Sequence, residues 1–449
     1  MTKVSVIMPA LNVAKYIRQC MESVINQTLK DIEIIVIDAG SSDGTLEILK
    51  EFEAKDSRVK LINSEKRSYG YQMNKGISIA QGEYIGIVET DDVIELDMYE
   101  TLYKKTYDMK PDYVKGSAKG FFELPGGVEF KYSILPCIEF KVNKNLTEIM
   151  VVPKEDPQLF WDDNFLWYGI YRADFLKKVF FHETPGAAFQ DIGALFQIIS
   201  SANSGIYIKK SVYNYRRSNL EASSYNKKNV NFANSEYEYI EQYLEGKSDE
   251  WICMYYKKML GLLLNRFDFM AISGQYWEES NEGIEKITKK LKRAFEENKI
   301  VYDEFIEKNK NRISLLFKDP KKLFEYDYNI LDKKRLSYSN VVNKCIGRNT
   351  FIFGAGIYGE FLNAYLSTKN KVSVKGFCDN NIKVQGTVIG NLKVFSLEES
   401  HKLCPDAFYL IASRLHNKEI KEQLMQKGIR EEDIYIFNEE IDVLMLLDN

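Results

Sequence analysis

The chain has 449 residues, of which 45% are hydrophobic and 28% are charged, and its formal net charge is −4 at pH 7. This length and composition support two or three domains with hydrophobic cores of their own. Because basic residues are spread along the chain rather than clustered, the composition lacks the footprint of a nucleic-acid-binding protein, and we expect no nucleic-acid partner.

Cysteines, histidines and apolar runs narrow the class of protein further. The six cysteines have no paired spacing and the chain has three histidines, which argues against a disulfide framework and against structural zinc. No basic, signal-like segment precedes the first apolar run, and no run approaches the length of a membrane span. We therefore expect a cytoplasmic protein, with at most a peripheral contact at the inner face of the membrane.

Apolar runs alternate with segments of helical periodicity in the first part of the chain. Strands are predicted over residues 4–8, 32–37 and 59–62, and helices over residues 17–25, 46–52 and 71–80. This alternation predicts an α/β fold with a parallel sheet, whose ligands bind beyond the carboxyl ends of the strands. The second strand ends at Asp38, and the glycine and hydroxyl residues of the turn after it let the backbone approach a ligand.

A fourth apolar run, Tyr84 to Val88, ends in three carboxylates, Glu89, Asp91 and Asp92. Carboxylates this close together repel one another unless a cation lies among them, and their oxygen atoms suit Mg²⁺ or Mn²⁺. The alternative is a solvated loop or the cap of the next helix. The order of the strands favours the cation site, because it places Asp38 and the carboxylates at one edge of the sheet.

Four motifs in this order resemble those of family-2 glycosyltransferases with the GT-A fold, and more narrowly those of bacterial enzymes that build capsule, lipopolysaccharide or exopolysaccharide. The motifs span Val4 to Asn12, Asp38 to Thr45, Tyr69 to Ile77 and Glu89 to Asp92. The resemblance covers roughly the first half of the chain. It implies an inverting, metal-dependent transfer of a sugar from a nucleotide-diphosphate donor to a growing surface glycan or a polyprenyl-diphosphate-linked acceptor.

The resemblance also implies roles for individual residues. It assigns the metal, Mn²⁺ or Mg²⁺, to Asp91 or Asp92, and it assigns the nucleotide sugar to Pro9, Asn12, Asp38, Ser41, Asn74 and Glu89. Two positions depart from the family pattern. Ala39 stands where the family often has a second Asp that meets the nucleobase, so a UDP-sugar is only the leading donor. Glu89 replaces the usual first Asp of Asp-x-Asp, which keeps the charge but lengthens the arm.

Three further residues come from motifs in the second half of this region. Asp191 precedes an apolar, helix-like run, where a carboxylate commonly caps the helix. The segment Glu183 to Asp191 resembles the family's Glu-Asp or Gln-Asp motif, which instead makes Asp191 the general base. By the same resemblance Trp167 stacks on the acceptor sugar and Arg216 binds the donor diphosphate, although an aromatic in an apolar run is often core and an arginine is often a surface charge.

The rest of the chain divides into a helical region and a second α/β region. Apolar positions recur every three or four residues over 229–348, and the run Met259 to Leu264 is expected to be buried rather than to touch a membrane. A linker is expected over residues 340–348. We therefore predict three domains, a GT-A domain over 1–228, the helical region over 229–348 and a Rossmann-like domain over 349–449.

The Rossmann-like prediction rests on a glycine pattern in context. Gly354, Gly356 and Gly359 follow an apolar run, and Asp379 comes 25 positions after the first glycine, which matches the dinucleotide-binding fingerprint. Nearby residues resemble the nucleotide-binding portion found ahead of sugar acyltransferases. The ligand is a dinucleotide or another nucleotide. No Tyr-x-x-x-Lys pair follows the glycines, so a binding module is favoured over a second catalytic centre.

Three functional classes remain. The first is the glycosyltransferase described above. The second is a sugar-nucleotide oxidoreductase or epimerase in which the C-terminal dinucleotide site does the chemistry, and the third is a non-catalytic assembly protein on a transferase fold. The carboxylates at the sheet edge and Asp191 favour the first class, while the missing Tyr-x-x-x-Lys pair argues against the second.

Overall fold

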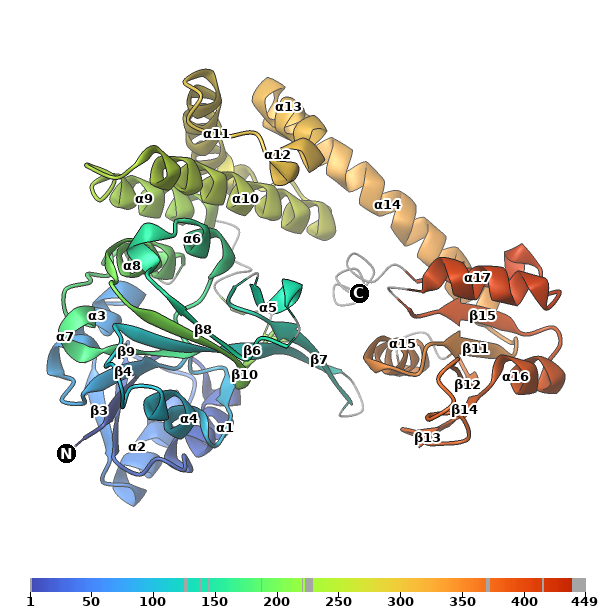
Figure 1. The fold of residues 1–449 in the computed structure, drawn as a ribbon, viewed down its shortest axis with the longest axis horizontal. Helices are drawn as coiled ribbons and strands as arrows, with labels where there is room; N and C mark the ends of the chain where they lie inside the picture. Colours follow the sequence, from blue (N-terminus) through green and yellow to red (C-terminus); the bar gives the residue numbers. More distant parts are fainter. Residues whose placement is uncertain are drawn as a thin grey trace. The chain divides into compact units, whose positions relative to one another are not determined.

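The computed structural model describes residues 2–437 except 125–127, 138, 144, 187, 220, 223–228, 369–371 and 414–415. The chain forms two compact units, each with its own sheet (Figure 1). The first unit comprises residues 1–121, 132–266 and 277–320, and the second comprises residues 122–131, 267–276 and 321–449. Most of the helical region thus belongs to the same unit as the first sheet, so the division differs from the three predicted domains.

The predicted parallel strands form one half of the first sheet. They are β1 (Val4–Ala10), β2 (Ile32–Asp38), β3 (Val59–Asn63) and β4 (Tyr84–Ile87), in the spatial order β3-β2-β1-β4. Every residue of β1 and β2 is buried, as the continuous apolar runs require for strands covered on both faces. The prediction of an α/β fold with a parallel sheet is confirmed.

The sheet continues from β4 through strands of mixed direction. The order is β4-β9-β6-β10-β5, with β7 paired to β6 and β8 paired to β10. The bounds are Val93–Ile94 for β5, Tyr113–Leu124 for β6, Val128–Ile134 for β7, Glu148–Val151 for β8, Gly169–Arg172 for β9 and Gly205–Arg216 for β10. Because β10 pairs with β5, its end lies beside the loop that carries Glu89 and Asp91.

Helices cover the two faces of the sheet. One face packs on α1 (Ala14–Ile25), α2 (Thr45–Lys55) and α4 (Met98–Lys104), which supply Ile17, Leu49 and Leu102 to a shared core. The opposite face packs on α3 (Tyr69–Ile79). Gly76 of α3 lies so close to this face that a Cβ there would come within 2.7 Å of Ile7, so only glycine allows the approach.

Shorter helices and α8 complete this layer. They are α5 (Glu139–Val142), α6 (Gln158–Asp162), α7 (Ala173–Leu176) and α8 (Gln190–Ser201), and a 3₁₀ turn spans Pro153–Glu155. The helix α8 contacts both α3 and α6. The helix α8 therefore lies beside α3, which follows β3 in the chain, and beside α6, which precedes β9.

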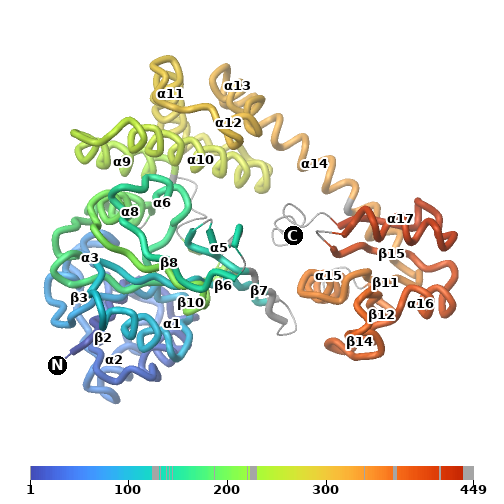
Figure 2. The backbone as a smooth tube through the Cα atoms, viewed as in Figure 1, coloured from blue at the N-terminus to red at the C-terminus, as the bar shows by residue number. Residues whose placement is uncertain are grey.

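The helical region extends this unit (Figure 2). Its helices are α9 (Asn229–Glu241), α10 (Asp249–Ser273), α11 (Asn281–Glu296), α12 (Glu304–Lys308) and α13 (Lys310–Lys318). The helix α9 packs on α8 and α11, and Trp251 of α10 meets Phe196 of α8 edge to face at 5.6 Å. Met259 and Leu263 are fully buried, which confirms the expected burial of this run. Within the described part of the chain, no helix has the length and apolar character needed to cross a membrane.

The second unit contains α14 (Pro320–Cys345) and a second sheet. Its strands are β11 (Thr350–Phe353), β12 (Val374–Cys378), β13 (Val388–Ile389), β14 (Leu392–Phe395), β15 (Phe408–Ile411) and β16 (Ile434–Ile436), in the order β13-β14-β12-β11-β15-β16. Its helices are α15 (Ile357–Thr368), α16 (Leu397–Leu403) and α17 (Asn417–Gln426). All pairs except β13 with β14 are parallel.

One sequence prediction for this unit is wrong. The expected linker over 340–348 is helical up to Cys345, because α14 continues through it. Its apolar face remains covered there, since Val341, Val342 and Cys345 are buried.

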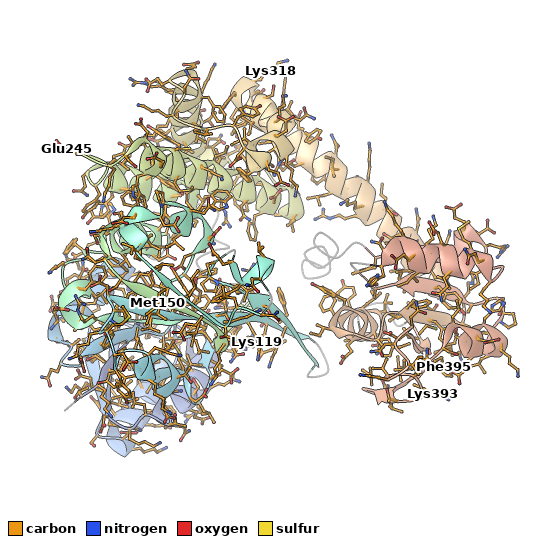
Figure 3. The ribbon with its side chains drawn as sticks, in the orientation of Figure 1. Lys119, Met150, Glu245, Lys318, Lys393 and Phe395 are labelled. Atoms are coloured by element: carbon orange, nitrogen blue, oxygen red, sulfur yellow. The ribbon has the colours of Figure 1, made fainter. Side chains whose placement is uncertain are left out.

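On β14, Phe395 packs edge to face on Phe351 of β11 at 5.7 Å, and Lys393 lies over the Phe395 ring (Figure 3).

Candidate active site

The turns after β1 and β2 are locked together by hydrogen bonds. The backbone N–H of Asn12 donates to the Ser41 hydroxyl at 2.9 Å, and the Ser42 N–H donates to Oδ1 of Asn12 at 2.9 Å. Asp38 is buried, and its carboxylate accepts the N–H groups of Gly40 and Ser41 at 2.9 and 3.0 Å as well as the Ser41 hydroxyl. Asp38 therefore shapes the turn, and the exposed Asn12 and half-buried Ser41 form its outer rim.

The loop after β4, residues 89–92, holds its three carboxylates in different environments. Asp92 is fully buried, and its oxygens accept the Tyr213 hydroxyl at 2.9 Å and the Arg216 N–H at 2.7 Å. Asp91 is partly exposed and accepts one bond from the Asn219 amide at 2.8 Å. Of the two predicted metal ligands, only Asp91 thus retains oxygen lone pairs toward solvent.

Arg216 lies beneath this loop. Its guanidinium donates to the Asp91 carbonyl at 2.7 Å and to Oε1 of Gln19 at 2.6 Å, and it stacks over the rings of Tyr16 and Phe121. The side chain is 3% exposed. Arg216 therefore orders the backbone of the acidic loop, which is a different role from the phosphate ligand that the sequence predicts.

Asp191 is the second residue of α8, so the prediction that it opens this helix is confirmed. Its carboxylate accepts the N–H of Ile192 at 3.0 Å. Burial raises the pKa of Asp191 to about 6, which suits a general base near neutral pH. The preceding Gln190 is buried and orders the approach to the helix, since it accepts the Ala188 N–H at 2.8 Å and donates to the Thr184 hydroxyl at 2.7 Å.

Charge effects connect Asp191 to the loop after β4. Burial is the main cause that raises the pKa of Glu89 to about 8; the charges of Asp91 and Asp191 act in the same direction, and the hydrogen bond from Tyr69 opposes them. Asp91 and Asp191 therefore each lie within electrostatic reach of Glu89. The structure thus brings together residues that are about a hundred positions apart in sequence, as the family resemblance implies.

Other predicted residues have structural contacts instead. Trp167 is 5% exposed and stacks between Phe165 and Tyr213, with ring centroids at 4.6 and 4.2 Å, so it offers no open ring face to an acceptor sugar. The Asn74 amide donates to the Phe181 carbonyl at 2.9 Å and to Glu183 at 3.1 Å.

Two remaining predictions concern residues near this edge. Pro9 is buried in β1, and its carbonyl accepts the Thr90 hydroxyl at 2.9 Å. The segment Val212 to Arg217, followed by Ser223 and Ser224, resembles the last motif of the family, and these two serines lie outside the described residues.

Two residues near the site were assigned no role from the sequence. Tyr69 donates its hydroxyl to Oε1 of Glu89 at 2.8 Å. Lys258 of α10 is buried, and its ammonium donates to the carbonyls of Phe160 and Asp163 and to Oδ1 of Asn164 at 2.5, 3.1 and 2.7 Å. Burial lowers the pKa of Lys258 to about 8, and the charges of Asp163 and Asp191 oppose this shift.

The loop at residues 89–92 can hold a divalent cation when the phosphates of a bound ligand supply the rest of its coordination. Among the described residues, no group of three His, Cys, Asp or Glu side chains could hold a metal ion by itself. Mg²⁺ is commonly held by one or two carboxylates together with substrate phosphates and water. Asp91 and Glu89 supply such carboxylates, whereas the oxygens of Asp92 are engaged by Tyr213 and Arg216.

The C-terminal glycines lie at a cavity of about 500 Å³ in the second unit, which is lined by Gly354, Gly356, Asp379 and Tyr358, among others. The cavity opens where the strand order reverses between β11 and β15, the usual ligand position in such sheets. Gly359 instead allows α15 to lie close to the loop that follows β11, since a Cβ there would lie 1.9 Å from the Gly354 carbonyl. Asp379 accepts the N–H groups of Ala355 and Asn381, both at 2.8 Å.

Comparisons with known proteins agree with this architecture. Residues 5–160 match the family described as Glycosyl transferase family 2, and residues 346–435 match the family described as C2185-like, N-terminal. The chain is 32% identical over 219 residues to glycosyltransferase GlyG of Streptococcus pneumoniae, which is 48% of this chain and 70% of GlyG. It is also 32% identical over 222 residues to GlyA of the same organism, which is 48% of this chain but 30% of GlyA.

A solved structure shows the same fold. Residues 1–349 of S. aureus TarS, in complex with UDP-GlcNAc, superpose with a TM-score of 0.52 at 18% identity, over 73% of this chain and 89% of that one. At this identity the likeness concerns the fold, which is that of the GT-A glycosyltransferases. Together with the family match and the extent of the GlyG alignment, it shows that this chain is a glycosyltransferase and belongs to glycosyl transferase family 2.

Proposed function

We propose that the first unit transfers a sugar, with inversion at the anomeric carbon, from a nucleotide-diphosphate donor to a hydroxyl of a growing surface glycan or lipid-linked acceptor. The observation that carries this proposal is the arrangement of Asp191, whose pKa is raised to about 6 by burial, within electrostatic reach of Glu89, which in turn lies within reach of Asp91. The reaction needs a base whose pKa is near neutral pH and carboxylates that hold a cation, and these residues supply both.

In this reaction Asp191 accepts the proton of the acceptor hydroxyl as its oxygen attacks the anomeric carbon. The new carbon–oxygen bond forms while the bond to the donor phosphate breaks, and the electron pair leaves with the nucleoside diphosphate. Asp91 and Glu89 would hold Mn²⁺ or Mg²⁺, which neutralises the charge that develops on the leaving diphosphate. The rim formed by Asn12 and Ser41 would receive the nucleoside part.

UDP-sugars are the first donors to test, since TarS, which shares the fold, was solved with UDP-GlcNAc. The experiment is a screen of sugar nucleotides for hydrolysis and transfer, with and without Mn²⁺, comparing the wild type with Asp191→Asn. We expect one donor class to be turned over by the wild type in Mn²⁺ and transfer to be lost in the variant. A chain that turns over no sugar nucleotide under any of these conditions would contradict the proposal.

We also propose that the second unit is a nucleotide-binding module. The cavity at Gly354 and Gly356 supports this role, because it has the size of a small-molecule site and lies beside the N-terminus of α15, which favours phosphate. This is also the site that the oxidoreductase alternative would use.

Calorimetry with UDP-sugars and with NAD⁺ tests the module. Around Gly356, a Cβ would meet no atom within 4 Å, so Gly356→Val should fill the cavity without disturbing the fold. We expect binding to this unit to be lost in the variant while donor hydrolysis by the first unit persists. Loss of donor hydrolysis in Gly356→Val would favour the oxidoreductase or epimerase alternative.

A further inference from the structure

Tyr69, the first residue of α3, is bonded to two separate loops. Its hydroxyl donates to Oε1 of Glu89 at 2.8 Å, and its backbone N–H donates to the Gly186 carbonyl at 3.0 Å. The Gly186 N–H donates in turn to the Arg67 carbonyl at 2.7 Å, and Ser68 and Gly186 form a parallel bridge. Tyr69 therefore connects the acidic loop to the segment that leads into α8 and Asp191.

The direction of the side-chain bond is fixed by the chemistry of the phenol. The phenol O–H is the donor to Oε1 of Glu89, since an ionised carboxylate only accepts hydrogen bonds. The other oxygen of Glu89, Oε2, has no hydrogen bond among the described residues.

The long side chain of Glu89 requires a hydrogen-bond partner to fix its orientation. A glutamate has one more rotatable bond than an aspartate, and ordering that longer arm costs conformational entropy. The Tyr69 hydroxyl fixes Oε1 and leaves Oε2 available to a ligand. A bond of this kind, to a group that itself binds the ligand, commonly changes metal affinity 10- to 100-fold, on the order seen for outer-shell partners.

We infer that Tyr69 is a positioning residue of the active site, which acts by holding Glu89 so that Oε2 faces the ribose and diphosphate of the donor and their cation. This inference rests on the proposed function of the first unit and deepens it by assigning the orientation of Glu89 to a residue outside the acidic loop. The aromatic ring itself packs on Phe181, with ring centroids at 6.2 Å, so the hydroxyl can be removed without removing that contact.

The test compares two tyrosines of the same helix. Tyr69→Phe removes the hydroxyl but keeps the ring and the backbone bond to Gly186. Tyr71→Phe is the matched control, because its hydroxyl donates to Glu65, away from the acidic loop. We expect the affinity for UDP with Mn²⁺, measured by calorimetry, to fall about 10- to 100-fold in Tyr69→Phe and to stay unchanged in Tyr71→Phe.

A double-mutant cycle with Glu89→Ala shows whether Tyr69 acts through Glu89. If it does, Tyr69→Phe should cost no further affinity in the Glu89→Ala background. Equal affinity of Tyr69→Phe and the wild type would overturn the inference, and so would losses that simply add in the double variant. Melting temperatures of all variants report whether a loss comes from unfolding instead, in which case the assignment to positioning would also be wrong.

The same measurements separate this inference from the proposed function. If the wild type binds UDP with Mn²⁺ but transfers no sugar, the proposed reaction is wrong, while the cycle still decides the role of Tyr69. If the wild type binds neither UDP nor any other nucleoside diphosphate in Mn²⁺, both the donor site and the role of Tyr69 are wrong.

Discussion

The backbone N–H of Arg216 donates to Oδ1 of Asp92 over 2.7 Å, although the two residues are 124 positions apart in sequence. This bond attaches the end of β10 to the acidic loop. The neighbouring residues Asp91 and Asp92 therefore differ: Asp92 is buried and bonded to β10, whereas Asp91 is partly exposed.

We expect Asp91→Ala and Asp92→Ala to fail in different ways. Asp92→Ala leaves the buried Arg216 N–H and Tyr213 hydroxyl without their acceptor, at a cost of about 1–3 kcal/mol for each group. Chemical denaturation should therefore show a less stable Asp92→Ala protein and an Asp91→Ala protein close to the wild type.

Donor turnover should require both a divalent metal and the carboxylate of Asp91. Donor turnover should stop in EDTA, return with Mn²⁺ or Mg²⁺, and be absent in Asp91→Ala at all metal concentrations. Full activity of the wild type in chelator would remove the metal from the mechanism, and a stable Asp92→Ala protein would contradict the structural role of that residue.

The role of Asp191 can be tested by a substitution that keeps its size. Asp191→Asn should bind UDP like the wild type, but sugar transfer should fall by roughly two to four orders of magnitude, the range for a lost general base. Asp31→Asn, at an exposed carboxylate that pairs with Lys3, serves as the control and should transfer at the wild-type rate. Transfer by Asp191→Asn at near the wild-type rate would show that another group takes the proton.

The pH dependence of transfer should report the same carboxylate. Because the pKa of Asp191 is about 6, kcat/KM should fall as the pH decreases through about 6, where the base becomes protonated. Lys258, with a pKa lowered to about 8, should contribute on the alkaline side. A profile that is flat between pH 5 and 7, a range about one unit either side of that pKa, would exclude Asp191 as the titrating base.

Stability should change with pH in the opposite sense. The pKa of Asp191 is higher in the folded chain than the ordinary aspartate value of 3.8. The unfolded chain therefore releases this proton first, and the carboxylate destabilises the fold as the pH rises from about 4 to 6. Asp191→Asn should therefore be more stable than the wild type at pH 7 and equally stable near pH 3.5. A variant that is less stable at pH 7 would mean that the carboxylate is needed by the fold.

The C-terminal sheet should be removable without loss of donor turnover, provided that α14 is kept. Leu331 and Tyr328 of α14 pack on Ala271 and Ile272 at the end of α10. A chain that ends at Gly347 keeps the whole of α14 and should hydrolyse donor. A chain that ends at Asp332 keeps Leu331 but loses the rest of α14, including Arg335, whose guanidinium donates to the Ile272 carbonyl, and it should be less stable. Loss of hydrolysis in a folded chain that ends at Gly347 would support a catalytic role for the second unit.

Sequence patterns predicted the parts of the fold that depend on local composition. The strands 4–8 and 32–37 were recognisable because both their faces are buried, which makes every residue except Ser5 and Glu33 apolar. Asp191 was placed at the start of its helix by the turn and the apolar run around it. The expected linker over 340–348 was wrong because polar side chains on one face of α14 resemble a linker when the buried face is not known.

The contacts of the site residues could not be predicted in the same way. The side chain of Arg216 turns inward because the Asp91 carbonyl and Gln19 accept hydrogen bonds from its guanidinium, and Trp167 is enclosed by Tyr213. These partners come from distant parts of the sequence and meet only in the sheet. Tyr69 was missed for the same reason, since nothing in its own motif indicates that a carboxylate of the loop after β4 accepts its proton.

The bonds of Lys258 have a consequence for how this enzyme can be divided. The family match ends at residue 160, yet Lys258 of α10 holds the carbonyl of Phe160 and the residues just after it. A chimera that exchanged residues 5–160 with a relative would separate that segment from the helix that fixes it. The smallest portion that can be transplanted intact therefore reaches well beyond the conventional family boundary and includes α10.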